Sequence, residues 1–106
     1  MMKRKIILIE AEHVYSNLEY VIDEKINGSF VTERKLIRKS LKEWEDELGN
    51  NFIRISKRYI INLDYVQRIN QDIVLKNGKE LKIPKVNQKK CRDSYYNYCN
   101  RKMKWE

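Results

Sequence analysis

The sequence is poor in the residues that build metal and catalytic sites. It holds one histidine, two cysteines, one proline and three glycines in 106 residues. One histidine and two cysteines do not provide any of the usual ligand spacings of a zinc site. There is also no Gly-rich phosphate loop and no nucleophile, base and acid spaced as in a known hydrolase. We therefore expect no enzyme activity, no metal, no cofactor and no small-molecule substrate.

Long apolar runs are missing as well. No stretch approaches the roughly 20 residues of a membrane span, and the start "MMKRKIILIEAEHV" turns acidic too early for a signal peptide. We expect a cytoplasmic protein. Cys91 and Cys99 lie in a segment with helical spacing, where a rise of about 1.5 Å per residue separates them by roughly 12 Å. A disulfide needs Cα atoms within about 7 Å, so two free thiols are predicted.

Positive charge is abundant and unevenly distributed. The formal net charge is +8 and the isoelectric point is near 9.5. Residues 1–50 hold 9 Lys and Arg against 10 Asp and Glu, whereas residues 51–106 hold 14 against 5. The second half therefore favours a phosphate-rich partner, either nucleic acid or an anionic membrane surface. The length suits one domain spanning residues 1–106.

Short apolar runs separated by polar breaks predict an antiparallel meander of strands in residues 6–37, with a turn at Asn27–Gly28. The break "EAEHVYSN" between its first two strands is either a functional loop or an ordinary connection. Further along, "DIVLKNGKELKIP" predicts a hairpin with a two-residue type I′ turn at Asn77–Gly78. That turn would place Val74 opposite Leu81 and allow burial on both faces of the hairpin.

Two segments have helical spacing. Ser40 and Glu43 form a capping box before a short helix over residues 41–48, with Trp44 facing the core and Gly49 at the C′ position. A second helix is predicted over residues 87–103. One of its faces carries Cys91, Tyr95, Tyr98, Cys99 and Lys102/Met103.

The segment "FIRISKRYIIN", residues 52–62, would be a continuous buried strand without Ser56, Lys57 and Arg58. Asn62 ends the apolar part and is predicted to tie down neighbouring backbone. Arg54 is expected either to contact phosphate or to pair with an acid on a neighbouring strand. The charged interruption itself needs an explanation, because a buried strand does not accommodate two adjacent cations.

The order and spacing of "IILIEAEHVY", "SLKEWEDELGNNFIRISKRYIINLDYVQRI" and "VLKNGKELKIPKVNQKKC" resemble the LytTR family of DNA-binding domains. The family pattern has a strand ending in Ile-Glu-Ala, a Ser-Leu-x-Glu helix, Phe-x-Arg-x-His-Arg-Ser-Tyr-x-Val-Asn, a Gly-containing hairpin and Ile-Pro before a basic helix. The resemblance covers nearly the whole chain. It implies a mainly β fold, an elongated antiparallel β-sandwich of short strands with one short helix and a C-terminal helix.

The resemblance also implies a transcription regulator that binds double-stranded DNA with direct repeats, through three separated loops. A second copy on the DNA or a regulatory protein is a further partner that it leaves open. Carried over position by position, with Arg54 and the basic helix face added, the implied DNA-contacting residues are Ser16, Asn17, Arg54, Lys57, Arg58, Lys85, Asn87, Gln88 and Lys89. Contacts by Lys57 and Arg58 would explain the charged interruption as a loop facing DNA.

The sequence departs from the family pattern at the DNA-facing positions. Ser56 replaces the family's His, Arg58 replaces its Ser, and Asn87 stands where Arg is usual after Ile-Pro. A first strand common in the family is expected to be absent, and no receiver domain precedes the "IEA" strand, so a stand-alone regulator is expected. The alternative is a basic module that binds a membrane or protein surface through the C-terminal helix, and single-stranded RNA binding is a third reading.

Overall fold

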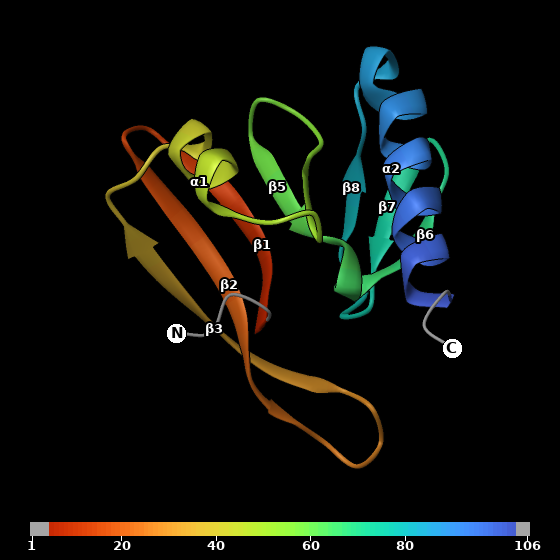
Figure 1. Cartoon of the computed structure of the whole chain (residues 1–106). Coiled ribbons are helices and arrows are strands. Elements are labelled where there is room, and N and C mark those ends of the chain that lie inside the picture. The colour runs from red at the N-terminus through yellow and green to blue at the C-terminus, as the bar shows by residue number, and fades with distance from the viewer. Residues whose placement is uncertain (1–4, 104–106) are drawn as a thin grey trace.

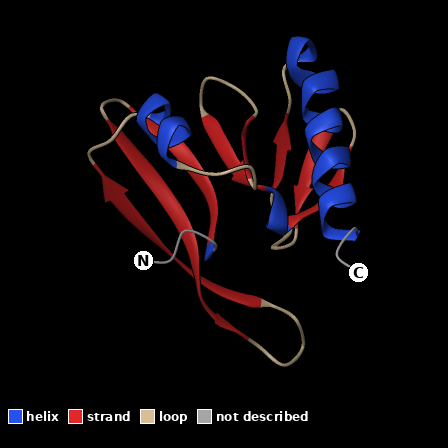
Figure 2. Cartoon of the chain, in the orientation of Figure 1, coloured by secondary structure: helices blue, strands red, loops and turns tan. Residues whose placement is uncertain are grey.

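The computed structural model describes residues 5–103, which fold into eight antiparallel strands and two α-helices (Figures 1 and 2). The elements are, in order, β1 (Ile6–Glu12), β2 (Tyr15–Glu24), β3 (Phe30–Ile37), α1 (Leu41–Glu47), β4 (Phe52–Arg54), β5 (Tyr59–Asn62), the short 3₁₀ helix η2 (Leu63–Tyr65), β6 (Val66–Ile69), β7 (Asp72–Leu75), β8 (Glu80–Lys82) and α2 (Lys85–Met103). No helix in the described range is long and apolar enough to cross a membrane.

The strands form two sheets with a shared core. A five-stranded sheet has the order β3-β2-β1-β5-β4, and a three-stranded sheet has the order β6-β7-β8. The main core joins Leu8 and Ile61 of the first sheet to Ile73 and Leu81 of the second. The predicted mainly β fold of antiparallel strands with two helices is therefore confirmed.

Strand β1 contributes to two cores, and its irregular register determines which residues belong to each. Ile7 and Leu8 both belong to the main core, whereas Ile6 and Ile9 pack in a second core on the side covered by α1. Regular strands alternate faces, and the shift in pairing between Ile6 and Leu8 lets neighbouring side chains serve the same core. Trp44 of α1 is 6% exposed in the second core, as predicted.

The β7–β8 hairpin differs from its prediction. A type I′ turn needs positive φ at both central residues, but of Asn77 and Gly78 only Gly78 has it, at 91°. The chain instead forms a three-residue loop over residues 76–78, closed by the bond from the Leu75 N–H to the Lys79 carbonyl. The register moves by one, so Leu81 pairs with Ile73 rather than Val74, and the hairpin is buried on one face only.

The β1–β2 connection is shorter than predicted. Strand β1 continues to Glu12 and β2 begins at Tyr15, so the loop expected over "EAEHVYSN" is a two-residue turn. His13 adopts a φ of 58°, which allows the tight reversal. Ser16 and Asn17 consequently lie inside β2 and not in a loop.

Most of the features predicted for the two helices are confirmed. Helix α1 has the predicted capping box between Ser40 and Glu43, but it ends through an extended Leu48 cap, and Gly49 does not take the left-handed C′ conformation. Helix α2 begins directly after Pro84, two residues earlier than predicted, because the fixed φ of proline suits a helix start. Residues 85–88 therefore form its first turn and not a loop.

The inner face of α2 packs against the main core. Cys91 is fully buried, and Tyr95 and Tyr98 are partly buried against the same core. Of the predicted pair Lys102/Met103, Lys102 lies beside Tyr98, with its Nζ 5.5 Å from the centre of that ring. Met103 is 74% exposed, because it lies past the end of the core. Both cysteines are free thiols, as predicted, and burial raises the pKa of Cys91.

Candidate nucleic-acid interface

Three segments that are distant in sequence lie along one end of the molecule (Figure 1). They are the β1–β2 turn, the loop of residues 55–58 between β4 and β5, and the first turn of α2, and all lie along the upper side of Figure 1. We call residues 55–58 the basic loop and this side of the molecule the loop end. The charged interruption of the "FIRISKRYIIN" segment is therefore the point at which the chain turns between two paired strands.

Arg54 holds the basic loop from inside. Its Nε donates to the Ser56 carbonyl at 3.1 Å and its Nη2 to the Lys57 carbonyl at 3.3 Å. Its Nη1 contacts the Glu45 carboxylate at 3.0 Å. The acid that pairs with Arg54 thus comes from α1 and not from a neighbouring strand. One planar guanidinium spans all three acceptors, which a lysine side chain does not do.

The two ends of the basic loop are held by other segments. Nδ2 of Asn87, in the first turn of α2, donates to the Ile55 carbonyl at 3.1 Å. At the other end, the Ala11 N–H of β1 donates to the Arg58 carbonyl at 2.7 Å. With the two bonds from Arg54, every carbonyl of the basic loop accepts a hydrogen bond. The loop is therefore held in one conformation from β1, β4 and α2.

Arg58 projects from the end of this loop and meets an acid. Its Nη2 lies 2.7 Å from Oε2 of Glu10 on β1, and its guanidinium lies 5.6 Å from the centre of the Tyr59 ring. The Tyr59 hydroxyl also donates to Glu10, at 3.4 Å. The Ser56 hydroxyl oxygen accepts the Arg58 N–H at 3.1 Å, which fixes the backbone on the other side.

Lys57 and Lys85 carry free positive charge at the loop end. Both are exposed, and neither has an acidic partner among the described residues. Lys85 opens α2, whose first turn contains no acid, so its charge adds to the positive end of the helix dipole. Lys89, one turn later, pairs with Asp93 at 3.0 Å and is partly neutralised.

The remaining predicted contact residues have intramolecular partners. Ser16 is fully buried, and its hydroxyl donates to the Lys39 carbonyl. Asn17 is half-buried and donates to Glu12 at 3.3 Å. Gln88 donates to the Ile83 carbonyl at 3.2 Å. Ser16 is buried and therefore not available at the surface of the loop end, whereas Asn17 and Gln88 lie at the edge of that surface.

The sequence reading missed Glu10 and Glu45, the acids that orient the two arginines. No local signal links Glu10 to Arg58, because the two residues are 48 positions apart and meet only through strand pairing.

Comparison with known proteins agrees with this fold. The family model for the LytTr DNA-binding domain matches residues 4–95. The chain belongs to the LytTr DNA-binding domain family. Its structure is similar to the LytTr DNA-binding domain of a protein described as a methyl-accepting/DNA response regulator from Bacillus cereus, with 18% identity, a TM-score of 0.59 and coverage of 95% of this chain and 83% of that chain. No curated protein matches the chain.

Membership of the LytTr family confirms the resemblance seen in the sequence. It assigns the chain a role in DNA-binding transcription regulation, with double-stranded DNA as the general partner. The solved structure, at its low identity, supports the fold alone.

The alternative reading of α2 as a membrane- or protein-binding helix gains no support from the LytTr fold of this chain. Tyr95 and Tyr98 of α2 pack against the main core, and the Tyr98 hydroxyl donates to Asp64. Burial, followed by that bond and the Asp64 charge, raises the pKa of Tyr98. Tyr95 and Tyr98 are thus already used inside the domain, whereas Tyr96 of the same helix is exposed.

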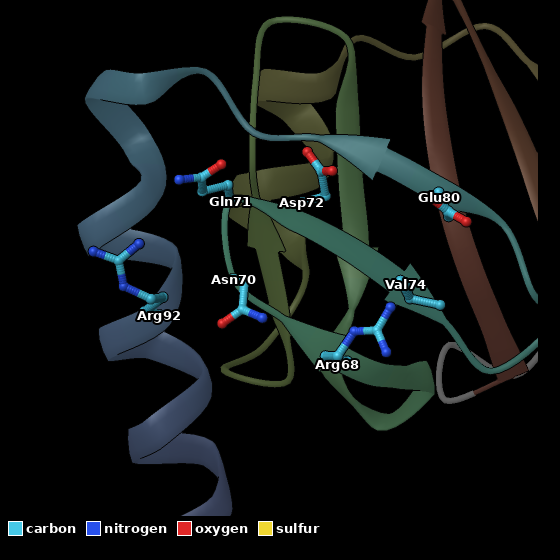
Figure 3. Close-up of a pocket in the computed structure, with 7 residues that line it drawn as sticks. All are labelled: Arg68, Asn70, Gln71, Asp72, Val74, Glu80 and Arg92. Carbon is cyan, nitrogen blue, oxygen red and sulfur yellow. The ribbon is translucent and has the colours of Figure 1, made fainter.

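A surface pocket of about 560 Å³ lies on the small sheet beside α2 (Figure 3). Arg68 and Arg92 line it together with Asp72 and Glu80, so its charges balance. It therefore lacks the uniform positive charge that attracts phosphate. Within residues 5–103, no group of three or more His, Cys, Asp or Glu side chains is placed to hold a metal ion.

Proposed function

We propose that this LytTr domain is a sequence-specific regulator that contacts duplex DNA with its loop end. The observation that carries the proposal is the pair of exposed, unpaired cations, Lys57 and Lys85, on two segments that are tied together by the bond from Asn87 to Ile55. A rigid loop and a helix N-terminus side by side match what phosphate binding requires. Asn17 and Gln88 lie at the edge of the same surface.

Two copies on direct repeats are part of the proposal. The smallest extent of the described chain is 25 Å, and its other two extents are 38 Å. Repeats one helical turn apart are separated by about 34 Å along the DNA. Two copies with their thin dimension along the DNA axis therefore fit side by side on one face of the duplex.

The proposed function is tested by titrating a fluorescent duplex with two direct repeats, selected from random DNA, against a scrambled duplex and a single strand at two salt concentrations. Preference for the selected duplex that persists at the higher salt supports the proposal. Equal binding to all three nucleic acids that disappears at the higher salt would mean that the chain binds only through its net positive charge, and it would reject the proposed function.

Lys57→Ala is expected to weaken binding to every duplex by about tenfold or less and to lower the slope of log affinity against log salt by about one, because one phosphate contact is lost. The thermal midpoint should hardly change, since the side chain is exposed. Lys76→Ala is the matched control: Lys76 is also exposed, but the β7–β8 turn lies opposite the loop end in Figure 1. A large drop in the midpoint would instead make Lys57 structural.

A further inference from the structure

An acid paired with Arg58, on a surface where Lys57 and Lys85 are proposed to bind phosphate, needs a physical reason. The negative charge of Glu10 repels the phosphates of DNA. The ion pair between Glu10 and Arg58 adds little to the stability of the fold, since exposed ion pairs contribute only weakly. The Arg58 side chain is 67% exposed and that of Glu10 21%. The pair therefore lies at the surface, where its effect on the fold is small and where Arg58 is accessible to a ligand.

Glu10 is a rigid support for Arg58. It lies in β1, where its neighbours across the sheet are Asn17 of β2 and Tyr59 of β5. The Arg58 backbone is fixed at both its N–H and its carbonyl, by Ser56 and Ala11. A guanidinium has five N–H donors, and Glu10 takes up the bond at Nη2, so donors remain for an outside ligand.

The negative charge of Glu10 determines which DNA group the remaining Arg58 donors can bind. A phosphate oxygen at Arg58 would approach the Glu10 carboxylate and be repelled by it. A base edge carries no net charge and does not suffer this repulsion. Among base edges in the major groove, guanine presents two adjacent acceptors, O6 and N7, which match two guanidinium donors.

We infer that Arg58, oriented by Glu10, reads a guanine base, whereas Lys57 and Lys85 contact phosphates. The inference rests on the proposed function and divides its surface into a base-reading part and a phosphate-binding part. Glu10 is then a positioning residue: it lowers affinity for DNA of any sequence and raises the discrimination between sequences.

The test uses the whole chain, a duplex selected from random DNA, and a double variant, Glu10→Gln with Arg58→Met, which removes both charges and leaves the net charge unchanged. Each guanine of the selected duplex is replaced in turn by 7-deazaguanine, which lacks the N7 acceptor. For the wild type, one such replacement should weaken binding by roughly five- to hundredfold, the range for loss of a good base contact. For the double variant that replacement should have no effect.

The salt slope supplies the second readout. The double variant should keep the wild-type slope on scrambled duplex, because a neutral pair releases no counterions. Glu10→Gln alone should bind scrambled duplex more tightly and with a steeper slope, since it frees the Arg58 charge. Lys57→Ala serves as the reference for a lost phosphate contact. Thermal midpoints of all variants show whether each one is folded.

The outcomes separate the inference from the proposed function. A double variant that keeps the 7-deazaguanine effect, or that loses about one from its salt slope, would overturn base reading by Arg58. A wild type that prefers the selected duplex but tolerates every 7-deazaguanine would also overturn it and leave the proposed function intact. A wild type with no preference for any duplex would reject the proposed function itself.

Discussion

Arg54→Lys is expected to weaken binding to a specific duplex by at least tenfold, although it keeps the positive charge. A lysine ammonium cannot reach Glu45 and the Ser56 and Lys57 carbonyls at once, whereas the Arg54 guanidinium bonds all three. The basic loop should then lose its single conformation. The domain should stay folded, since the three lost bonds lie at a partly exposed site within one loop and cost about 1 kcal/mol each.

The size of the effect follows from conformational entropy. Fixing the backbone of one residue costs about 1–2 kcal/mol, so ordering residues 56–58 only on binding DNA would cost several kcal/mol. The bonds at Ile55 and Arg58 remain in the variant and reduce that figure. A loss of at least tenfold, about 1.4 kcal/mol, is therefore a conservative expectation.

The variant also distinguishes two roles for Arg54. If Arg54 acted by contacting phosphate, lysine would preserve the contact and affinity would hardly change. If it acts by holding the loop, ¹⁵N relaxation should show greater mobility of the Ser56 to Arg58 amides in the variant. Arg68→Lys is the matched control, because Arg68 is exposed on β6. If the Arg54→Lys variant has a loop as rigid as that of the wild type and an unchanged affinity for DNA, then Arg54 does not act by holding the basic loop.

The strands and helices were predictable where the signal is local. The Ser40 capping box, the periodic placement of Trp44 and the alternating apolar runs depend on residues a few positions apart, and the fold follows them. The β7–β8 register was not predictable from the Asn77–Gly78 pair, because that pair suits both a two-residue and a three-residue turn. The choice depends on which pairing buries Ile73, Leu75 and Leu81 together.

The candidate interface was predictable only in part, for a similar reason. Lys57 and Arg58 stand out because they interrupt an apolar segment. The bonds that hold them do not, since Asn87 reaches Ile55 across 32 positions and Arg58 reaches Glu10 across 48. Such contacts depend on how the sheets and α2 are placed. They give Arg54 and Asn87 a role in holding the basic loop, which we propose to face DNA.

Asn62→Ala is expected to lower the free energy of unfolding by about 2–4 kcal/mol. Asn62 is fully buried, its Nδ2 donates to the Ile6 carbonyl at 2.8 Å, and its Oδ1 accepts the Asp64 N–H at 2.9 Å. Alanine would leave a buried carbonyl without this donor, at about 1–3 kcal/mol, and would remove the cap of η2, at about 1 kcal/mol.

The position of Asn62 explains why this effect should exceed that of a surface asparagine. Asn62 ends β5 where the chain passes from the five-stranded sheet through η2 to the small sheet, and its two bonds join that crossing to the start of β1. Urea denaturation measures the change, and Asn100→Ala, on the exposed side of α2, should stay within about 0.5 kcal/mol of the wild type. Equal stability of the two variants would mean that the two Asn62 bonds do not stabilise this crossing. A selective loss at Asn62 would instead show that this buried amide stabilises the crossing from the sheet that carries Glu10 to the sheet that supports α2.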